Sequence, residues 1–103
     1  MKLQSRNQGS YAVLRLLKKI YKHNLKVMQL NHYNYGWERG FVLSNLFYPS
    51  LAVTFSEDRR SDDIVVYELD WNDASDSQRE KAYESRQMCE TPRQAAVAIV
   101  EAL

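Results

Sequence analysis

An aromatic segment is the most distinctive local feature of this sequence. Residues 32–39 read HYNYGWER, which places several large rings beside a cation. Tyrosine, tryptophan and arginine are enriched at the energetic centres of protein–protein interfaces. We interpret Tyr33, Tyr35, Trp37 and Arg39 as a candidate protein-interaction site. Two alternatives stay open: the rings could close the end of the core, or they could stack on unpaired bases.

A second candidate site is a row of basic residues near the N-terminus. Residues 11–23 have apolar side chains at helical spacing, and the basic side chains fall on the opposite stripe. This alternative, nucleic-acid-binding surface consists of Arg15, Lys18, Lys19, Lys22 and Lys26. Cations are also favourable near the C-terminal end of a helix, so a simple solvated face would give the same pattern.

The charge of the chain is divided unevenly along the sequence. The 103 residues carry a formal net charge of only +1. Residues 1–40 contain eight basic side chains and one acidic side chain, whereas residues 41–103 contain six and twelve. The first part therefore has a net charge of +7 and the second a net charge of −6. Such a split suggests a basic face for phosphates or an acidic protein, charge pairing within the domain, or head-to-tail self-association.

Most site chemistries find no support in the sequence. Glycines at 9, 36 and 40 match neither nucleotide-binding spacing. One cysteine and two histidines are too few for structural zinc, and the acidic residues of 57–63 do not follow a calcium-loop spacing. His32 is the best acid–base candidate, but no nucleophile motif accompanies it. We therefore expect no catalytic residue, cofactor, metal or small-molecule substrate.

Cys89 and the N-terminal residues indicate the compartment. With one cysteine the chain forms no internal disulfide, and residues 1–10 have no apolar stretch like that of a signal peptide. No apolar run approaches the length of a membrane span. We expect an intracellular, cytoplasmic protein without a membrane partner. We interpret Cys89 as a small buried side chain near a helix end rather than a reactive thiol.

The elements that must position these residues begin with a helix and continue with strands. We expect a flexible arm over 1–9, then a helix over 11–23 with Ser10 as its N-cap and a stop at Asn24, although one longer helix would also fit. Alternation from residue 26 predicts a strand, followed by a turn over 31–40. Runs at 41–48, 51–56 and 64–69 predict three further strands, with a charged hairpin loop at 57–63.

Two helices are expected after the strands. A short polar helix over 77–88 would begin at Asp76 or Ser77. Thr91 followed by Pro92 predicts the start of a last helix that buries one apolar face. The alanines at 95, 98 and 102 form a small-residue strip along that helix, for packing on the sheet or for a dimer contact.

Together these elements predict one α+β domain over residues 10–103. It would have an N-terminal helix, a three- to four-stranded antiparallel meander, and one or two C-terminal helices on one sheet face. We expect a small non-enzymatic regulator, adaptor or inhibitor that binds a protein partner or a second copy of itself. An origin in a phage, virus or plasmid would suit so short a chain. Nucleic-acid binding through the basic helix is the alternative. The order of elements is also that of a double-stranded-RNA-binding domain, but the last helix lacks the basic N-terminus expected there.

Overall fold

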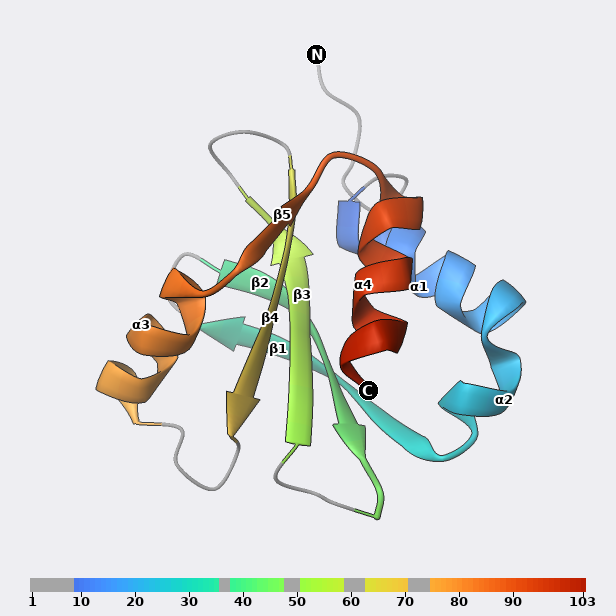
Figure 1. The fold of residues 1–103 in the computed structure, drawn as a ribbon, viewed down its shortest axis with the longest axis horizontal. Helices are drawn as coiled ribbons and strands as arrows, with labels where there is room; N and C mark the ends of the chain where they lie inside the picture. The colour runs from blue at the N-terminus through green and yellow to red at the C-terminus, as the bar shows by residue number, and fades with distance from the viewer. Residues whose placement is uncertain (1–8, 36–37, 48–50, 59–62, 71–74) are drawn as a thin grey trace.

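The domain is an antiparallel sheet with helices on both faces (Figure 1). The computed structural model describes residues 9–35, 38–47, 51–58, 63–70 and 75–103. Within them the elements are α1 (Gly9–Ile20), α2 (Lys22–Leu25), β1 (Met28–Tyr35), β2 (Glu38–Asn45), β3 (Leu51–Glu57), β4 (Ile64–Asp70), α3 (Asp76–Glu84), β5 (Gln87–Cys89) and α4 (Pro92–Ala102). The predicted arm over 1–9 lies outside the described residues except for Gly9, which already belongs to α1.

The sheet confirms the predicted α+β class and antiparallel meander. Its strand order is β1-β2-β3-β4-β5, so each strand pairs with its neighbour in the sequence. The register pairs Leu30 with Leu43 and Phe41 with Phe55. The sheet has five strands rather than three or four. The extra strand is β5, whose three residues pair with Ile64, Val65 and Val66 of β4.

Residues 31–35 and 38–40 belong to strands β1 and β2, so their prediction as a turn was wrong, whereas residues 36 and 37 lie outside the described residues. Strands β1 and β2 pair along their whole length, from Met28 opposite Asn45 to Tyr35 opposite Glu38. Gly40 had suggested a turn but lies within β2, opposite Ser56. A β-carbon at Gly40 would collide with the Phe55 carbonyl oxygen of β3. This glycine therefore permits close contact between two strands, which is the other common use of glycine in a sheet.

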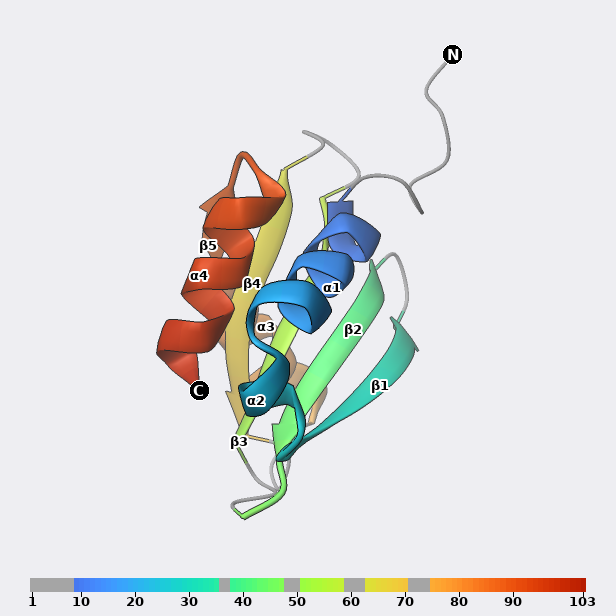
Figure 2. The same cartoon turned by 90° about the vertical axis from the view of Figure 1, so that its right-hand side faces the viewer.

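Helices α1, α2 and α4 lie on one face of the sheet (Figure 2). α1 packs most extensively against α4 and also reaches β3, whereas α4 covers β4, β3 and β5. Side chains from both helices and from alternate strand positions form one core. Its fully buried members include Val13, Leu17, Phe55 and Ile99. The apolar stripes predicted for the first and last helices are the sides that face this core.

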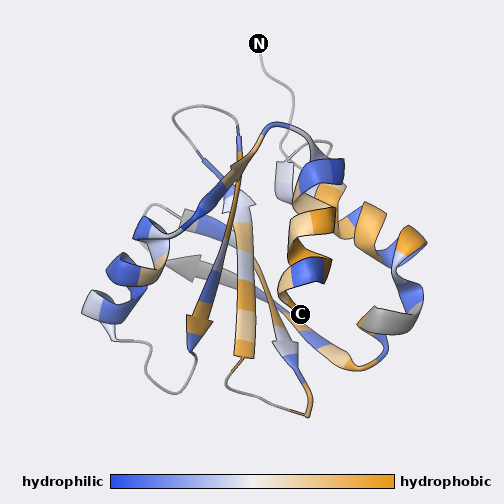
Figure 3. Ribbon diagram, viewed as in Figure 1, coloured by the Kyte–Doolittle hydropathy of each residue, from blue (hydrophilic) through white to orange (hydrophobic). Residues whose placement is uncertain are grey.

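Helix α3 lies on the opposite face, against β4 (Figures 1 and 2). The Tyr83 ring meets the Tyr67 ring edge-on, with centroids 5.6 Å apart. Most of α3 is hydrophilic (Figure 3), in contrast with the apolar stripes of α1 and α4. Of the two C-terminal helices, only α4 therefore shares a face with α1. The polar composition of α3 fits a helix with one small packed side.

Helix ends differ from the sequence predictions where local signals compete. The first helix is broken after Ile20, and α2 ends at Leu25 rather than at Asn24. Ser10 is a buried residue inside α1 and not its cap. α3 begins after Ser75, whose hydroxyl accepts a hydrogen bond from Gln78 N, and it ends at Glu84 rather than 88. The predicted start at Thr91-Pro92 is confirmed, with a complete capping box between Thr91 and Gln94.

Candidate interaction surfaces

The five predicted basic residues lie on one continuous stretch of the structure. Arg15, Lys18 and Lys19 belong to α1, Lys22 to α2, and Lys26 to the turn before β1. All five are exposed. Helical hydrogen bonds continue across the break, from Tyr21 N to Leu17 O (2.9 Å) and from Leu25 N to Tyr21 O (3.1 Å). The stripe predicted from spacing is therefore carried from α1 into α2.

Packing of α1 on its inner side fixes this orientation. Val13 and Leu17 are 0% and 1% exposed, and both belong to the core. The Tyr11 ring meets the Phe41 ring edge-on at 5.2 Å between centroids. Residues 9–35 contain no acidic side chain. Because the apolar side is buried, the cations face solvent with no acidic neighbour on α1, α2 or β1.

Two exposed apolar residues follow β2 close to the turn that carries Lys26. Leu46 is 51% exposed and Phe47 is 72% exposed, just after β2. Leu46 N donates a hydrogen bond to Val27 O at 3.2 Å, which extends the β1–β2 pairing to the turn that carries Lys26. Phe47 N in turn donates to Asn45 Oδ1 at 2.8 Å. We call the combined region the basic–apolar surface, formed by Arg15, Lys18, Lys19, Lys22, Lys26, Leu46 and Phe47.

Sequence reasoning did not identify the apolar half of this surface. Residues 41–48 had been predicted as one strand, which would leave Leu46 and Phe47 as ordinary strand positions. The strand instead ends at Asn45. A signal was present in the sequence, because two large apolar residues stand next to each other before Pro49, where period-2 alternation breaks.

The aromatic candidate site occupies the end of the β1–β2 hairpin. Tyr33 and Tyr35 lie on β1, and Arg39 on β2 is exposed and pairs with Asn34. Trp37 and the side chains of Tyr33 and Tyr35 lie outside the described part of the chain. The register thus places the backbone of Tyr33, Tyr35 and Arg39 at one end of the β1–β2 pair, and the role of the aromatic rings stays a prediction.

His32 has a structural neighbour. Its ring lies edge-on to the Phe41 ring, with centroids 5.4 Å apart, and the two residues face each other in the register. The imidazole itself is exposed. Within the described ranges, no group of three or more His, Cys, Asp or Glu side chains could hold a metal ion.

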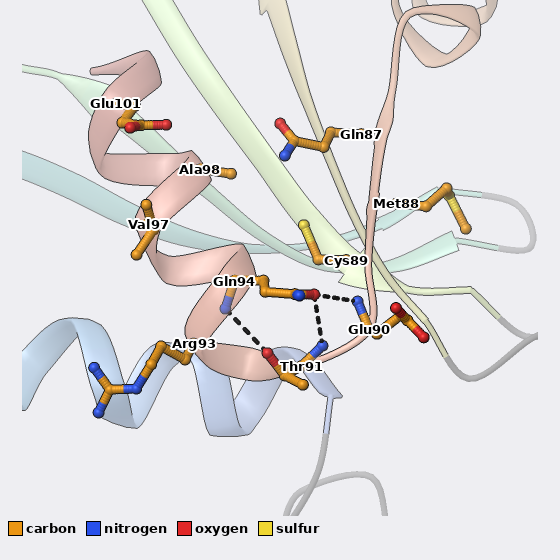
Figure 4. Close-up of a pocket in the computed structure, with 10 residues that line it drawn as sticks. All are labelled: Gln87, Met88, Cys89, Glu90, Thr91, Arg93, Gln94, Val97, Ala98 and Glu101. Carbon is orange, nitrogen blue, oxygen red and sulfur yellow. Dashed lines mark hydrogen bonds between the residues drawn. The ribbon is translucent and has the colours of Figure 1, made fainter.

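A groove runs between α4 and the edge strand β5 (Figure 4). It has a volume of about 510 Å³. Gln94 fixes one end, because its Oε1 accepts hydrogen bonds from Glu90 N (2.9 Å) and Thr91 N (3.3 Å). The backbone N–H of Gln94 donates a hydrogen bond to Thr91 Oγ1 at 3.2 Å. The sequence did not predict this groove, because residues 87 and 88 of β5 were assigned to the end of a helix.

Cys89 lies on the wall of this groove and is only 2% exposed. Burial raises the pKa of the Cys89 thiol, and the nearby Asp63 carboxylate raises it further. Both effects keep the thiol protonated at neutral pH, which makes it a poor nucleophile. The packing agrees with the interpretation of Cys89 as a small buried side chain.

Comparisons with protein families, with curated proteins and with solved structures find no match for this chain. In the described part of the chain, each helix is too short or too polar to cross a membrane.

Proposed function

We propose that this chain is a small non-enzymatic binding domain that contacts an acidic partner protein through the basic–apolar surface. The observation that carries this proposal is the Leu46–Val27 hydrogen bond, which joins the exposed Phe47 region to the basic turn. Complementary charge steers two proteins together, and an exposed aromatic ring supplies apolar contact once they meet. A regulator, adaptor or inhibitor would work in this way.

The low net charge of the chain and the limited extent of its basic patch favour a protein over nucleic acid as the partner. The surface has five cations, while the chain as a whole carries a formal net charge of +1 and has a pI of about 7.8. Nucleic-acid-binding domains usually have a pI above roughly 9. Residues 41–103 carry twelve acidic and six basic side chains, so a long polyanion that extended beyond the patch would meet a net negative charge. A partner with a limited acidic area avoids this repulsion.

The chemistry of the candidate catalytic groups supports a binding role. Burial raises the pKa of the Cys89 thiol and keeps it protonated, and the His32 ring packs edge-on against Phe41. The hairpin end with Tyr33, Tyr35, Trp37 and Arg39 stays a second proposed contact for the partner.

Capture of binding proteins by the immobilised chain tests the proposal. We would compare the unaltered chain with Lys22→Glu/Lys26→Glu and with Phe47→Ser, and quantify the bound proteins by mass spectrometry. Lys81→Glu is the matched control, because Lys81 is an exposed lysine on α3, away from the surface. We expect acidic proteins to bind the unaltered chain and the control variant. Both test variants should no longer capture these proteins. Equal capture by all four proteins would contradict the proposal.

Fluorescence anisotropy with labelled DNA and RNA tests the nucleic-acid alternative. Five phosphate contacts would weaken binding on the order of 500-fold between about 50 and about 200 mM salt. Binding with that salt dependence, abolished by Lys18→Glu/Lys22→Glu, would replace the protein partner with nucleic acid. The absence of binding at the lower salt concentration would leave the protein proposal as the better one.

A further inference from the structure

The outer side of α4 has a simple repeating pattern. Arg93, Val97 and Glu101 follow each other at intervals of four residues, so they lie on one side of the helix. All three are exposed and line the groove beside β5 (Figure 4), and Val97 is 39% exposed. Ala96 and Ile99, by contrast, point into the core. The inner side of α4 therefore holds the helix in place and leaves this outer stripe available for contact.

Along this stripe a basic residue is followed by an apolar residue and then by an acidic one. The stripe is therefore complementary to a copy of itself that runs in the opposite direction. The cation and the anion lie on either side of Val97, separated along the helix axis by about 12 Å. Two copies of α4 related by a two-fold axis at Val97 would run antiparallel. Arg93 of one copy would then lie opposite Glu101 of the other, and this pairing would occur twice. A second copy of the chain matches this arrangement by symmetry.

We propose that this chain forms a two-fold symmetric dimer in which α4 packs antiparallel against α4 of a second copy. Val97 meets its counterpart at the axis, and the two Arg93–Glu101 pairs flank it. Ala98, which is 7% exposed and lines the same groove, has no long side chain to keep the second helix away. The second α4 then lies along the groove between α4 and β5.

The size of the contact determines how strong this dimer is. A contact centred on one eleven-residue helix falls well below the roughly 1,200–2,000 Å² of a stable interface, so the association is weak. Dimers should accumulate only at protein concentrations of roughly 10 µM to 1 mM. The proposal is independent of the proposed function, because the basic–apolar surface lies on other elements. A dimer would nevertheless present two such surfaces, which increases binding to any repeated partner.

Sedimentation velocity over that concentration range tests the proposal through charge exchange. The unaltered chain should shift from monomer to dimer as its concentration rises. Arg93→Glu and Glu101→Arg each place like charges opposite one another, and each should weaken dimerisation on the order of tenfold. An equimolar mixture of these two variants has opposite charges at both contacts, so the mixture should dimerise like the unaltered chain. Restoration by mixing excludes misfolding as the cause of the loss.

A covalent trap gives a second readout at the axis itself. Val97→Cys places two thiols at the proposed axis, and mild oxidation should link them into a dimer. Lys81→Cys introduces an exposed thiol on α3 as the matched control, which should cross-link much more slowly. The proposal is wrong if the unaltered chain stays monomeric throughout, if the charge variants dimerise equally well, or if the mixture remains monomeric.

Discussion

The two faces of the sheet are both buried, but by different chemistry. The side chains toward α1 and α4 are apolar or nearly so: Phe41, Leu43, Val53, Phe55, Ile64, Val66 and Cys89. The alternate side chains on the other face are Val42, Ser44, Ala52, Thr54, Ser56, Val65, Tyr67 and Leu69, and four of these eight carry a hydroxyl. Ser44 Oγ and Thr54 Oγ1 are buried, and each lacks a hydrogen-bond partner in the described part of the structure. Burial alone therefore does not make the two faces equivalent.

The comparison shows which face holds the domain together. On the α1/α4 face, two helices with apolar stripes close over the strands, and Phe41 stacks against Phe55 at 5.6 Å between ring centroids. On the α3 face, one mostly polar helix contributes the Tyr83–Tyr67 contact. Apolar burial stabilises in proportion to area, whereas a buried hydroxyl without a partner costs free energy. We therefore expect most of the folding free energy to come from the α1/α4 face.

The largest expected effect is the removal of a ring from the α1/α4 face. Phe55→Ala leaves a cavity at a position that is 0% exposed, and it should lower the free energy of unfolding by about 3–5 kcal/mol. Tyr83→Ala on the α3 face should cost about 1–2 kcal/mol, because that ring is only partly buried. Urea denaturation followed by circular dichroism measures both. Equal losses would show that the two faces stabilise the domain equally.

A smaller difference is expected between the caps of α4 and α3. Thr91→Ala removes the capping box that starts α4 and should cost about 1 kcal/mol. The Ser75 hydroxyl caps α3 through a longer bond of 3.4 Å from Gln78 N, and its other hydrogen bond, to Ser77 Oγ, is equally long, so Ser75→Ala should cost a few tenths of a kcal/mol, at about the lower limit for a cap. Thermal unfolding of the two variants in parallel ranks them. A larger loss for Ser75→Ala than for Thr91→Ala would contradict this ranking of the two helix caps.

The smallest effect, and the only stabilising one, is expected at Thr54. Thr54→Val replaces a buried hydroxyl without a hydrogen-bond partner by a methyl group of similar size. The free energy of unfolding should stay equal or rise, by up to about 1 kcal/mol. The same urea titration provides the measurement, with Ser44→Ala as a second site of the same kind. A clear loss of stability would mean that the Thr54 hydroxyl is hydrogen-bonded in solution.

The sequence predicts the well-patterned parts of this fold. Runs of β-branched and aromatic residues locate β3 and β4 to within one residue, and Thr91-Pro92 locates the start of α4. β5 was missed because three residues make a strand only through pairing with β4, which no local pattern reveals. Gly40 was predicted to lie in a turn, because the sequence alone does not distinguish a glycine in a turn from a glycine that lets a neighbouring strand approach closely. The buried hydroxyls of β3 likewise have the pattern of a solvent-facing side.

The candidate surfaces were predictable to different degrees. The basic stripe follows from helical spacing, and all five of its cations are exposed as expected. Its union with Leu46 and Phe47 depends on the β1–β2 register, which brings residues far apart in sequence to the same place. The four-residue spacing of Arg93, Val97 and Glu101 is visible in the sequence. Only the structure shows that this side of α4 faces outward.

The packing of α1 on α4 determines the order in which the chain can fold. Every strand pairs with its sequence neighbour, so the hairpins can form locally and early. The apolar stripe of α1 cannot be fully covered until α4 is present, and α4 follows all five strands in the chain. During synthesis we expect the part of the α1 stripe that packs on α4 to stay exposed while the strands emerge. We therefore expect the first helix and the last to become protected from solvent together.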